Sequence, residues 1–211
     1  FVAVGQPANA SVRALFTQIF YMIYTARIKK AIRFAITTHE IDQQQKRKGK
    51  DIAYITHPLT VGLILAGCGA SEEVVAAGIL HDTIEDSISS KKVTREMLVE
   101  EFGENVAMLV ASVSEKSKEL SWDERKREAL EHISRFSHDS LLVKSADILS
   151  NASELIDDVA HDGQKVFSRF NVPKEKIVQH YLRSIAVIIQ GWDGSPLVDD
   201  LRSLTNELQI L

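Results

Sequence analysis

The stretch 78–86 (GILHDTIED) constrains the fold most, because an apolar run meets four ionisable residues there within six positions. Residues four apart lie on one face of a helix, so His81 would lie one turn before Glu85. Asp82 precedes Asp86 in the same way. The apolar residues of the stretch would then face a core. The pattern therefore predicts a helix that packs on one side and presents a polar site on the other.

The ionisable residues of this stretch suit a metal and a water. Imidazole nitrogen and carboxylate oxygen are ligands for a borderline divalent ion, and the adjacent His81 and Asp82 can reach the same ion. Glu85 and Asp86, just beyond, could hold or deprotonate an attacking water. The same residues are also explained by a polar helix end, in which an aspartate is a cap and His81 a hydrogen-bonded surface residue. The rest of the chain has to decide between these interpretations.

The composition favours an all-α fold in a single domain. A chain of 211 residues can bury a core without disulfides, and this one is 45% apolar with only 4 prolines and little strand-like alternation. The net charge of −4 gives no general attraction to nucleic acid or to an anionic membrane, so phosphate binding would need a local basic patch. The single cysteine, Cys68, excludes an intrachain disulfide and fits a reducing compartment. No apolar stretch is long enough to cross a membrane, and we expect a cytoplasmic protein.

Apolar residues recur at helical spacing along most of the chain. The residues between 155 and 172 are instead expected to form an irregular connection with one short helix. Apolar stripes on the outer helices suggest a homodimer. The predicted helices cover 10–24, 26–42, 59–65, 71–86, 94–102, 105–113, 121–133, 174–189 and 197–211.

A basic, turn-rich segment at 43–51 precedes a histidine that is followed by proline. The segment contains Arg47 and Lys48. Pro58 at the first position of a helix would hold His57 at the helix N-terminus, with an oriented ring. A charged run is often only a solvated loop. A basic loop next to a fixed histidine, however, suits a phosphate that lies beside a metal.

The stretch 141–151 places three polar residues on one face of an otherwise apolar helix. Lys144, Asp147 and Asn151 are spaced by three and four residues. A lone carboxylate on such a helix is costly unless it is ion-paired or bound to a metal. Asp147 is therefore a candidate fourth ligand, and an internal salt bridge to Lys144 is the alternative. Lys144 and Asn151 would then lie one turn to either side of the ion.

Taken together, His57, the His81-Asp82 pair and Asp147 resemble the ligand pattern of the HD-domain metal-dependent phosphohydrolases. Over residues 28–190 the chain further resembles the hydrolase domain of RelA/SpoT homologues, most closely the stand-alone small alarmone hydrolases. The segments that carry this resemblance are QKRKG at 45–49, YITHP at 54–58, LHDTIED at 80–86, LVKSAD at 142–147 and RFNVPKEK at 169–176.

The resemblance implies an all-helical fold with a single manganese ion. The HD core would span about residues 26–191 of one domain, 1–211, with the helices at 10–24 and 197–211 as extensions. Glu85 and Asp86 would orient and activate the attacking water. The implied metal ligands are His57, His81, Asp82 and Asp147.

The resemblance also implies a small nucleotide as substrate. Arg47 and Lys48 would face its phosphates and Asn151 its sugar or base, with Lys144 and Tyr181 as further contacts. The implied reaction removes the 3′-pyrophosphate from guanosine tetra- or pentaphosphate. A metal would lower the pKa of the attacking water, and the basic loop would stabilise charge on the phosphorus centre.

Three departures from the family pattern bear on the substrate rather than on the metal. Three extra residues lie between His39 and Gln45, Ala53 stands where proline is usual, and Ser153 where arginine is frequent. An adenine alarmone, a nicotinamide dinucleotide 2′-phosphate or another nucleotide could therefore enter the same site. A helical binding module without catalysis is the alternative from another class, although a scaffold would not need the complete set of ligands and acidic residues.

Overall fold

The computed structural model describes residues 25–115 and 120–211, and in this part of the chain it contains helices, loops and no named β-strand. The all-α prediction is confirmed. The helix predicted at 10–24 lies outside the described residues. The helices are α2 (Ala26–Ile36), η1 (Thr37–Asp42), α3 (Thr56–Gly67), α4 (Glu72–Leu80), α5 (Thr83–Asp86), η2 (Ser89–Lys91), α6 (Arg95–Phe102), α7 (Glu104–Val113), α8 (Trp122–Ile133), α9 (His138–Asp162), η3 (Gly163–Arg169), α10 (Lys174–Gly191) and α11 (Val198–Ile210).

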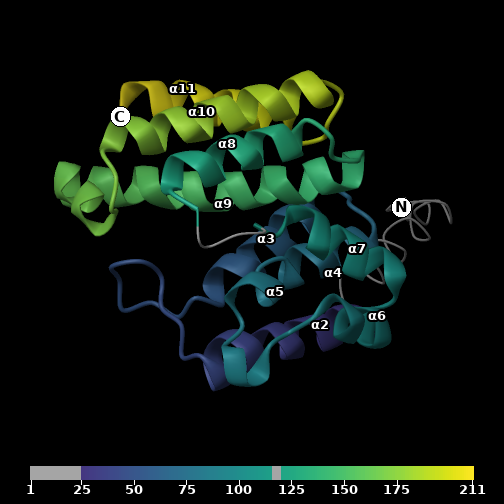
Figure 1. The fold of residues 1–211 in the computed structure, drawn as a ribbon. Helices are drawn as coiled ribbons and strands as arrows, with labels where there is room; N and C mark the ends of the chain where they lie inside the picture. Colours follow the sequence, from purple (N-terminus) through teal and green to yellow (C-terminus); the bar gives the residue numbers. More distant parts are fainter. Residues whose placement is uncertain (1–24, 116–119) are drawn as a thin grey trace, which may run out of the picture.

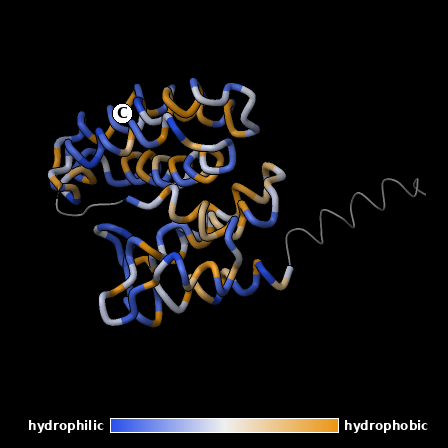
Figure 2. The backbone as a smooth tube through the Cα atoms, turned by 45° about the vertical axis from the view of Figure 1, so that its right-hand side comes forward, coloured by the Kyte–Doolittle hydropathy of each residue, from blue (hydrophilic) through white to orange (hydrophobic). Residues whose placement is uncertain are grey.

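The helices form two layers, with α8 to α11 in one layer and α2 to α7 in the other (Figure 1). Hydrophilic and hydrophobic residues alternate along most of the helices, which allows these helices to turn an apolar face inward (Figure 2). The predicted C-terminal helix is present as α11, and it packs against α9 and α10 of the same chain. No helix in the described ranges combines the length and the hydropathy that a bilayer span requires.

Side-chain caps or a glycine satisfy several helix ends. The hydroxyls of Ser71 and Thr94 accept backbone N–H bonds at the starts of α4 and α6. Ser121 and Glu124 form a complete capping box at the start of α8. Gly103, at φ 90°, ends α6 in a conformation that favours glycine.

Two predicted boundaries were wrong. Helix α9 continues through Asp162, so residues 155–162 are helical rather than irregular, and the chain leaves the helix at Gly163, with φ 73°. Helix α3 begins at Thr56, so Pro58 is its third residue rather than its first. Proline is tolerated throughout the first turn, because those N–H groups have no helical acceptor.

The predicted helix over 26–42 is present, but its last six residues form the π-helix η1. This segment contains His39 and lies beside the three extra residues noted before Gln45. The segment after η1 folds back onto it, because the Gln45 N–H donates to the His39 carbonyl at 2.8 Å.

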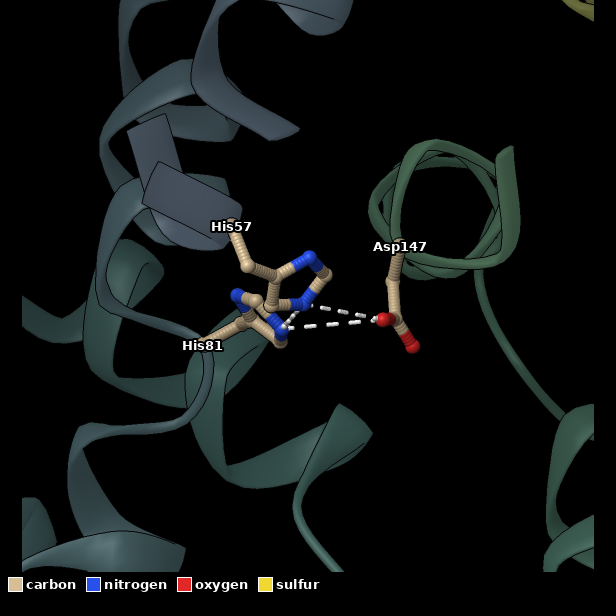
Figure 3. Close-up of side chains that lie close together, drawn as sticks. All are labelled: His57, His81 and Asp147. Atoms are coloured by element: carbon tan, nitrogen blue, oxygen red, sulfur yellow. Dashed lines mark hydrogen bonds and ion pairs between the residues drawn. The ribbon is translucent and has the colours of Figure 1, made fainter. Parts of the chain in front are cut away.

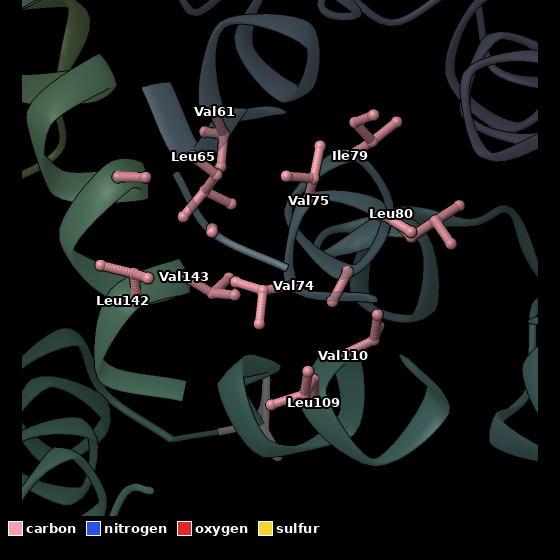
Figure 4. Close-up of a cluster of buried hydrophobic side chains, with 14 of the residues drawn as sticks. Val61, Leu65, Val74, Val75, Ile79, Leu80, Leu109, Val110, Leu142 and Val143 are labelled. Carbon is pink, nitrogen blue, oxygen red and sulfur yellow. The ribbon is translucent and has the colours of Figure 1, made fainter. Parts of the chain in front are cut away.

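The core lies where α3, α4, α7 and α9 meet, and α4 is buried on all sides (Figure 4). Two glycines allow α3 and α4 to approach closely. A Cβ atom on Gly78 would lie 2.2 Å from Leu65 Cδ1, and one on Gly62 would lie 2.5 Å from Ile79 Cγ1. This close packing brings the start of α3 beside the end of α4, where the two candidate histidines lie.

Candidate metal centre

His57, His81 and Asp147 converge at the junction of α3, α4 and α9 (Figure 3). His57 lies in the first turn of α3, His81 follows the last residue of α4, and Asp147 lies in the middle of α9. All three residues are buried, and their ligand atoms lie within 4.8 Å of one another. Three of the four predicted ligands therefore form one cluster.

Hydrogen bonds on the outer side of each ring orient the histidines. His81 Nδ1 lies 2.8 Å from the Gly78 carbonyl oxygen. A carbonyl can only accept, so Nδ1 is the donor and Nε2 turns toward the centre. His57 Nδ1 lies 2.9 Å from Ser150 Oγ, which leaves its Nε2 facing the same centre. The two Nε2 atoms are 3.2 Å apart.

The atoms that meet at the centre fit a cation. Asp147 Oδ1 lies 3.3 Å from His57 Nε2, and Asp82 Oδ2 lies 3.0 Å from His81 Nε2. Two ring nitrogens without protons and two carboxylate oxygens would repel one another unless a positive charge stood between them. Without a metal a proton takes this place: burial lowers the pKa of His81, but Asp82 and Asp147 outweigh it and raise the pKa to about 9. Imidazole and carboxylate together form a donor set that holds divalent metals.

Asp147 makes both of the interactions that the sequence left as alternatives. Its Oδ1 faces the histidines and accepts a bond of 2.7 Å from Asn151 Nδ2. Its Oδ2 accepts a bond of 2.6 Å from Lys144 Nζ. Burial raises the pKa of Asp147, but Lys144 and His57 lower it well below the usual range, so the carboxylate is ionised.

The single helix predicted over 71–86 is interrupted at the HD pair. Helix α4 ends at Leu80, and α5 begins at Thr83. The Thr83 hydroxyl donates to the Leu80 carbonyl at 2.7 Å, a local bond of the kind that competes with the helical ladder. Helix α5 then has its own first helical bond, from the Asp86 N–H to the Asp82 carbonyl at 2.9 Å.

The break leaves Asp82 beside the histidines. Its Oδ2 lies 3.0 Å from His81 Nε2 and 3.7 Å from His57 Nε2, and it accepts a bond of 2.5 Å from the Tyr54 hydroxyl. Burial raises the pKa of Asp82, but the two histidines outweigh it and lower the pKa below its usual range. Burial and the Asp82 charge raise the pKa of Tyr54, so this phenol stays a donor.

The two carboxylates of α5 have different partners. Glu85 Oε2 accepts a bond of 3.2 Å from the Glu115 backbone N–H. Burial and the charges of Asp82 and Glu115 raise the pKa of Glu85. Asp86 Oδ2 accepts a bond of 2.9 Å from Gln45 Nε2. The predicted role of this pair in water activation stays a prediction.

Four of the five predicted substrate contacts line one cavity of about 340 Å³ beside the metal centre, and they are Arg47, Lys48, Asn151 and Tyr181. The Arg47 side chain is only 11% exposed, and its Nη2 donates to Asn151 Oδ1 at 2.8 Å and to Glu154 Oε2 at 2.6 Å. Lys48 Nζ lies 4.9 Å from the centre of the Phe170 ring. Burial and Asp147 raise the pKa of Tyr181 to about 12, so it is a neutral hydrogen-bonding group.

Lys144, the fifth predicted contact, lines a different cavity, on the α8 side of Asp147. Tyr54, Ser150 and Glu154 have supporting roles that the sequence did not predict, because they hold Asp82, His57 and Arg47 respectively. Ser150 lies three residues after Asp147 on α9, so its helical spacing was an available signal. Glu154 gave none, because it lies 107 residues from Arg47.

Comparisons with known proteins agree with this geometry. A family model described as "HD domain" matches residues 31–174. A curated relative from Danio rerio, named guanosine-3′,5′-bis(diphosphate) 3′-pyrophosphohydrolase MESH1, is 37% identical over 133 residues, which cover 62% of this chain and 70% of the relative. A guanosine-3′,5′-bis(diphosphate) 3′-pyrophosphohydrolase from Aquifex aeolicus is 36% identical over 137 residues, which are 64% of this chain and 18% of that longer protein.

Two solved structures share the fold. One, described as a metazoan ortholog of SpoT that hydrolyzes ppGpp, superposes with a TM-score of 0.70 at 24% identity and covers 89% of this chain and 98% of its own. The other, lmo0812 from Listeria monocytogenes, has a TM-score of 0.65 at 30% identity and covers 73% and 97% of the two chains. The fold likeness extends over both helical layers.

Proposed function

The chain belongs to the HD-domain family, and we propose that it is a metal-dependent phosphohydrolase that removes the 3′-pyrophosphate from guanosine tetra- or pentaphosphate. One observation carries the proposal: His57, His81 and Asp147 form a buried acceptor cluster, with Asp82 Oδ2 3.0 Å from His81 Nε2, beside a cavity lined by basic residues. Relatives over two thirds of whose length this chain aligns are named as hydrolases of this kind, which supports the substrate.

We propose that His57, His81, Asp82 and Asp147 hold one divalent ion, Mn²⁺. A divalent ion supplies positive charge that polarises a phosphoryl oxygen and lowers the pKa of an attacking water. The protein's contribution is to fix the donors beforehand. Gly78 O and Ser150 Oγ hold the outer ring nitrogens, so both Nε2 atoms point inward without rearrangement.

Glu85 and Asp86 are proposed to orient the attacking water and to take its proton. Both carboxylates follow the HD pair directly on α5. The bond from Gln45 holds Asp86, and the bond from the Glu115 backbone holds Glu85. A base held in place and partly desolvated accepts a proton more readily than a freely solvated carboxylate, which is the condition for general base catalysis.

The cavity beside Asn151 is proposed to bind the nucleoside and its 5′-phosphates. The positively charged side chains of Arg47 and Lys48 line this cavity, and so does Tyr181. Glu154 now pairs with both Arg47 and Lys50, at 2.6 and 2.5 Å. An incoming phosphate would replace this carboxylate as the partner of Arg47, because a guanidinium binds either anion through parallel N–H bonds.

The proposal extends to the organisation of the protein. We expect one domain, in which the HD core at about 26–191 carries α11 as a packed extension, and we expect it in the cytoplasm, as the single Cys68 suggested. A small nucleotide is the partner, rather than nucleic acid or a membrane. A homodimer through the outer helices stays a prediction that sedimentation analysis can test.

The test is product analysis after incubation of the manganese-loaded protein with guanosine tetraphosphate. Pyrophosphate and guanosine diphosphate in equal amounts support the proposal, and a chelator should abolish their release. Adenine alarmones and nicotinamide dinucleotide 2′-phosphate are run in parallel. Release of inorganic phosphate from only one of these nucleotides would support the proposed metal site and contradict the proposed substrate. No release from any nucleotide would favour the helical binding module.

A further inference from the structure

A second cavity, of about 220 Å³, lies on the other side of Asp147, between α7, α8, α9 and α10. Successive turns of α9 connect the two cavities. Lys144 lines the second cavity and donates to Asp147 Oδ2, whereas Asn151 lines the first and donates to Asp147 Oδ1. Asp147 therefore has one partner in each of these two cavities, and the proposed nucleoside site occupies only the first.

Side chains of both charges line the second cavity, and they are Arg125, Arg135, Lys144, Glu115, Glu128 and Glu131. The Glu115 carboxylate pairs with Arg125 at 2.9 Å and with Lys126, and Lys144 adds to the positive field around it. The positive potential also affects His180, because burial and the charges of Lys126 and Lys144 lower its pKa to about 3. Arg125 and Lys126 thus share the Glu115 carboxylate, while Lys144 pairs with Asp147 beside them. A cluster of three cations of this kind is able to accept a further anion.

Two nitrogens on the cavity wall have no hydrogen-bond partner among the described residues. They are Arg125 Nε and His180 Nδ1, and both are buried. A buried polar nitrogen without a partner costs free energy, so such atoms usually mark a site that a ligand or a water completes. Phosphate oxygens would satisfy a guanidinium N–H and an imidazole N–H together.

The cavity is also connected to the proposed base. The backbone N–H of Glu115 donates to Glu85 Oε2, and the side chain of the same residue pairs with Arg125 and Lys126. An anion that displaced the Glu115 carboxylate would therefore lie close to both Glu85 and Asp147. A group leaving the metal centre on the side away from the nucleoside would meet these cations first.

We propose that the second cavity binds the leaving pyrophosphate through Arg125 and Lys144, which line it, and that the Glu115 carboxylate pairs with Arg125 and Lys126 until the anion arrives. This inference rests on the proposed function. In the reaction the bond from the 3′ oxygen to phosphorus breaks, the oxygen of water joins that phosphorus, and the 3′ oxygen takes a proton. The pyrophosphate anion then binds beside Lys144, while the nucleoside diphosphate stays beside Asn151.

The test is calorimetric binding of pyrophosphate to the manganese-loaded protein, with guanosine diphosphate titrated separately. Arg125→Gln should weaken pyrophosphate binding about tenfold or more and leave guanosine diphosphate unchanged, since a charged hydrogen bond is lost. Arg127→Gln is the matched control, because Arg127 is an exposed neighbour on the same helix. Equal binding of pyrophosphate by all three proteins would overturn the inference.

A variant that gains affinity for pyrophosphate completes the test, because misfolding could only weaken binding. Glu115→Gln removes the competing carboxylate and keeps the backbone N–H that holds Glu85, so pyrophosphate should bind more tightly than to the parent. If the protein cleaves guanosine tetraphosphate but all the variants bind pyrophosphate equally well, this inference is overturned and the proposed function stands. If the variants change the affinity for pyrophosphate as expected but the protein cleaves no nucleotide, the proposed function is overturned and the cavity is a pyrophosphate site only.

Discussion

The metal centre and the basic loop are built in opposite ways. At the centre, the histidines are oriented by Gly78 and Ser150, whose bonds a metal would leave intact. In the loop, Arg47 and Lys50 are held by Glu154, and an anionic substrate would have to displace that pair. The fold therefore prepares the metal site in advance, whereas substrate recognition competes with internal ion pairs. Substitutions should accordingly affect chemistry at the centre and affinity at the loop.

Removal of a proposed metal ligand should have the largest effect. Asp147→Ala deletes the carboxylate that faces both histidines and leaves Lys144 without its partner. We expect metal content to fall at least tenfold, since the loss of outer partners alone costs about 10–100-fold in affinity. Hydrolysis should fall below detection. Elemental analysis after gel filtration measures the metal.

Asp157→Ala is the control for this substitution, because Asp157 is an exposed carboxylate on the same helix. It should retain both metal and activity. A metal content in Asp147→Ala equal to that of the control would show that the ion lies elsewhere.

Loss of the proposed base should separate metal binding from turnover. Glu85→Gln keeps the size of the side chain but removes its charge, so kcat should fall by about 10²–10⁴ while the metal content stays that of the parent. Steady-state kinetics and elemental analysis on one preparation test both points. Glu100→Gln, at an exposed position of α6, is the control. Full activity of Glu85→Gln would exclude this residue as the base.

The loop should respond in KM rather than in kcat. Arg47→Gln removes a guanidinium from the nucleoside cavity, and we expect KM to rise about tenfold or more, the effect of one lost charged hydrogen bond. Arg202→Gln changes the same residue type on the surface of α11 and should leave KM unchanged. A fall in kcat at constant KM would place Arg47 in the chemical step and remove the contrast between loop and centre.

The same contrast explains what the sequence could predict. The convergence of His57, His81, Asp82 and Asp147 could be predicted, because these residues lie on regular helices or at their ends, where spacing predicts direction. The break between Leu80 and Thr83 was missed, since a single hydroxyl bond decides it.

The pairs across the loop were missed for another reason. Arg47 and Glu154 are 107 residues apart, and the cations of the second cavity come from α8 and α9. Helical spacing describes one helix at a time, so contacts between distant segments carry no such signal. The ion pairs that substrate recognition must displace are the part of the site that required the structure.

The glycine contact beneath the metal centre should affect stability. In Gly78→Ala the new Cβ would lie 2.2 Å from Leu65 Cδ1, and overpacking of this kind costs about 1–3 kcal/mol. Gly67→Ala, with no atom within 4 Å of the new Cβ, should instead stabilise by about 0.4–1 kcal/mol. Urea unfolding in the presence of chelator measures both. Equal stability of the two variants would show that α3 and α4 are not closely packed at this point.

Burial and the cations around His180, on the wall of the second cavity, should make folding stability modestly dependent on pH. The pKa of His180 is lowered to about 3 by burial and by Lys126 and Lys144, against about 6.5 in the unfolded chain. Between these values the unfolded state binds more protons, so folding stability falls as the pH falls, at most by about 1.4 kcal/mol per pH unit and by less where solvent reaches the ring. His180→Gln removes this proton uptake, and its stability should therefore decline less than that of the parent between pH 7 and pH 5, in roughly the window that these pKa values define. Denaturant unfolding at several pH values measures the difference, and parallel curves for the two proteins would mean that burial and the two lysines do not lower the pKa of His180 in the folded protein.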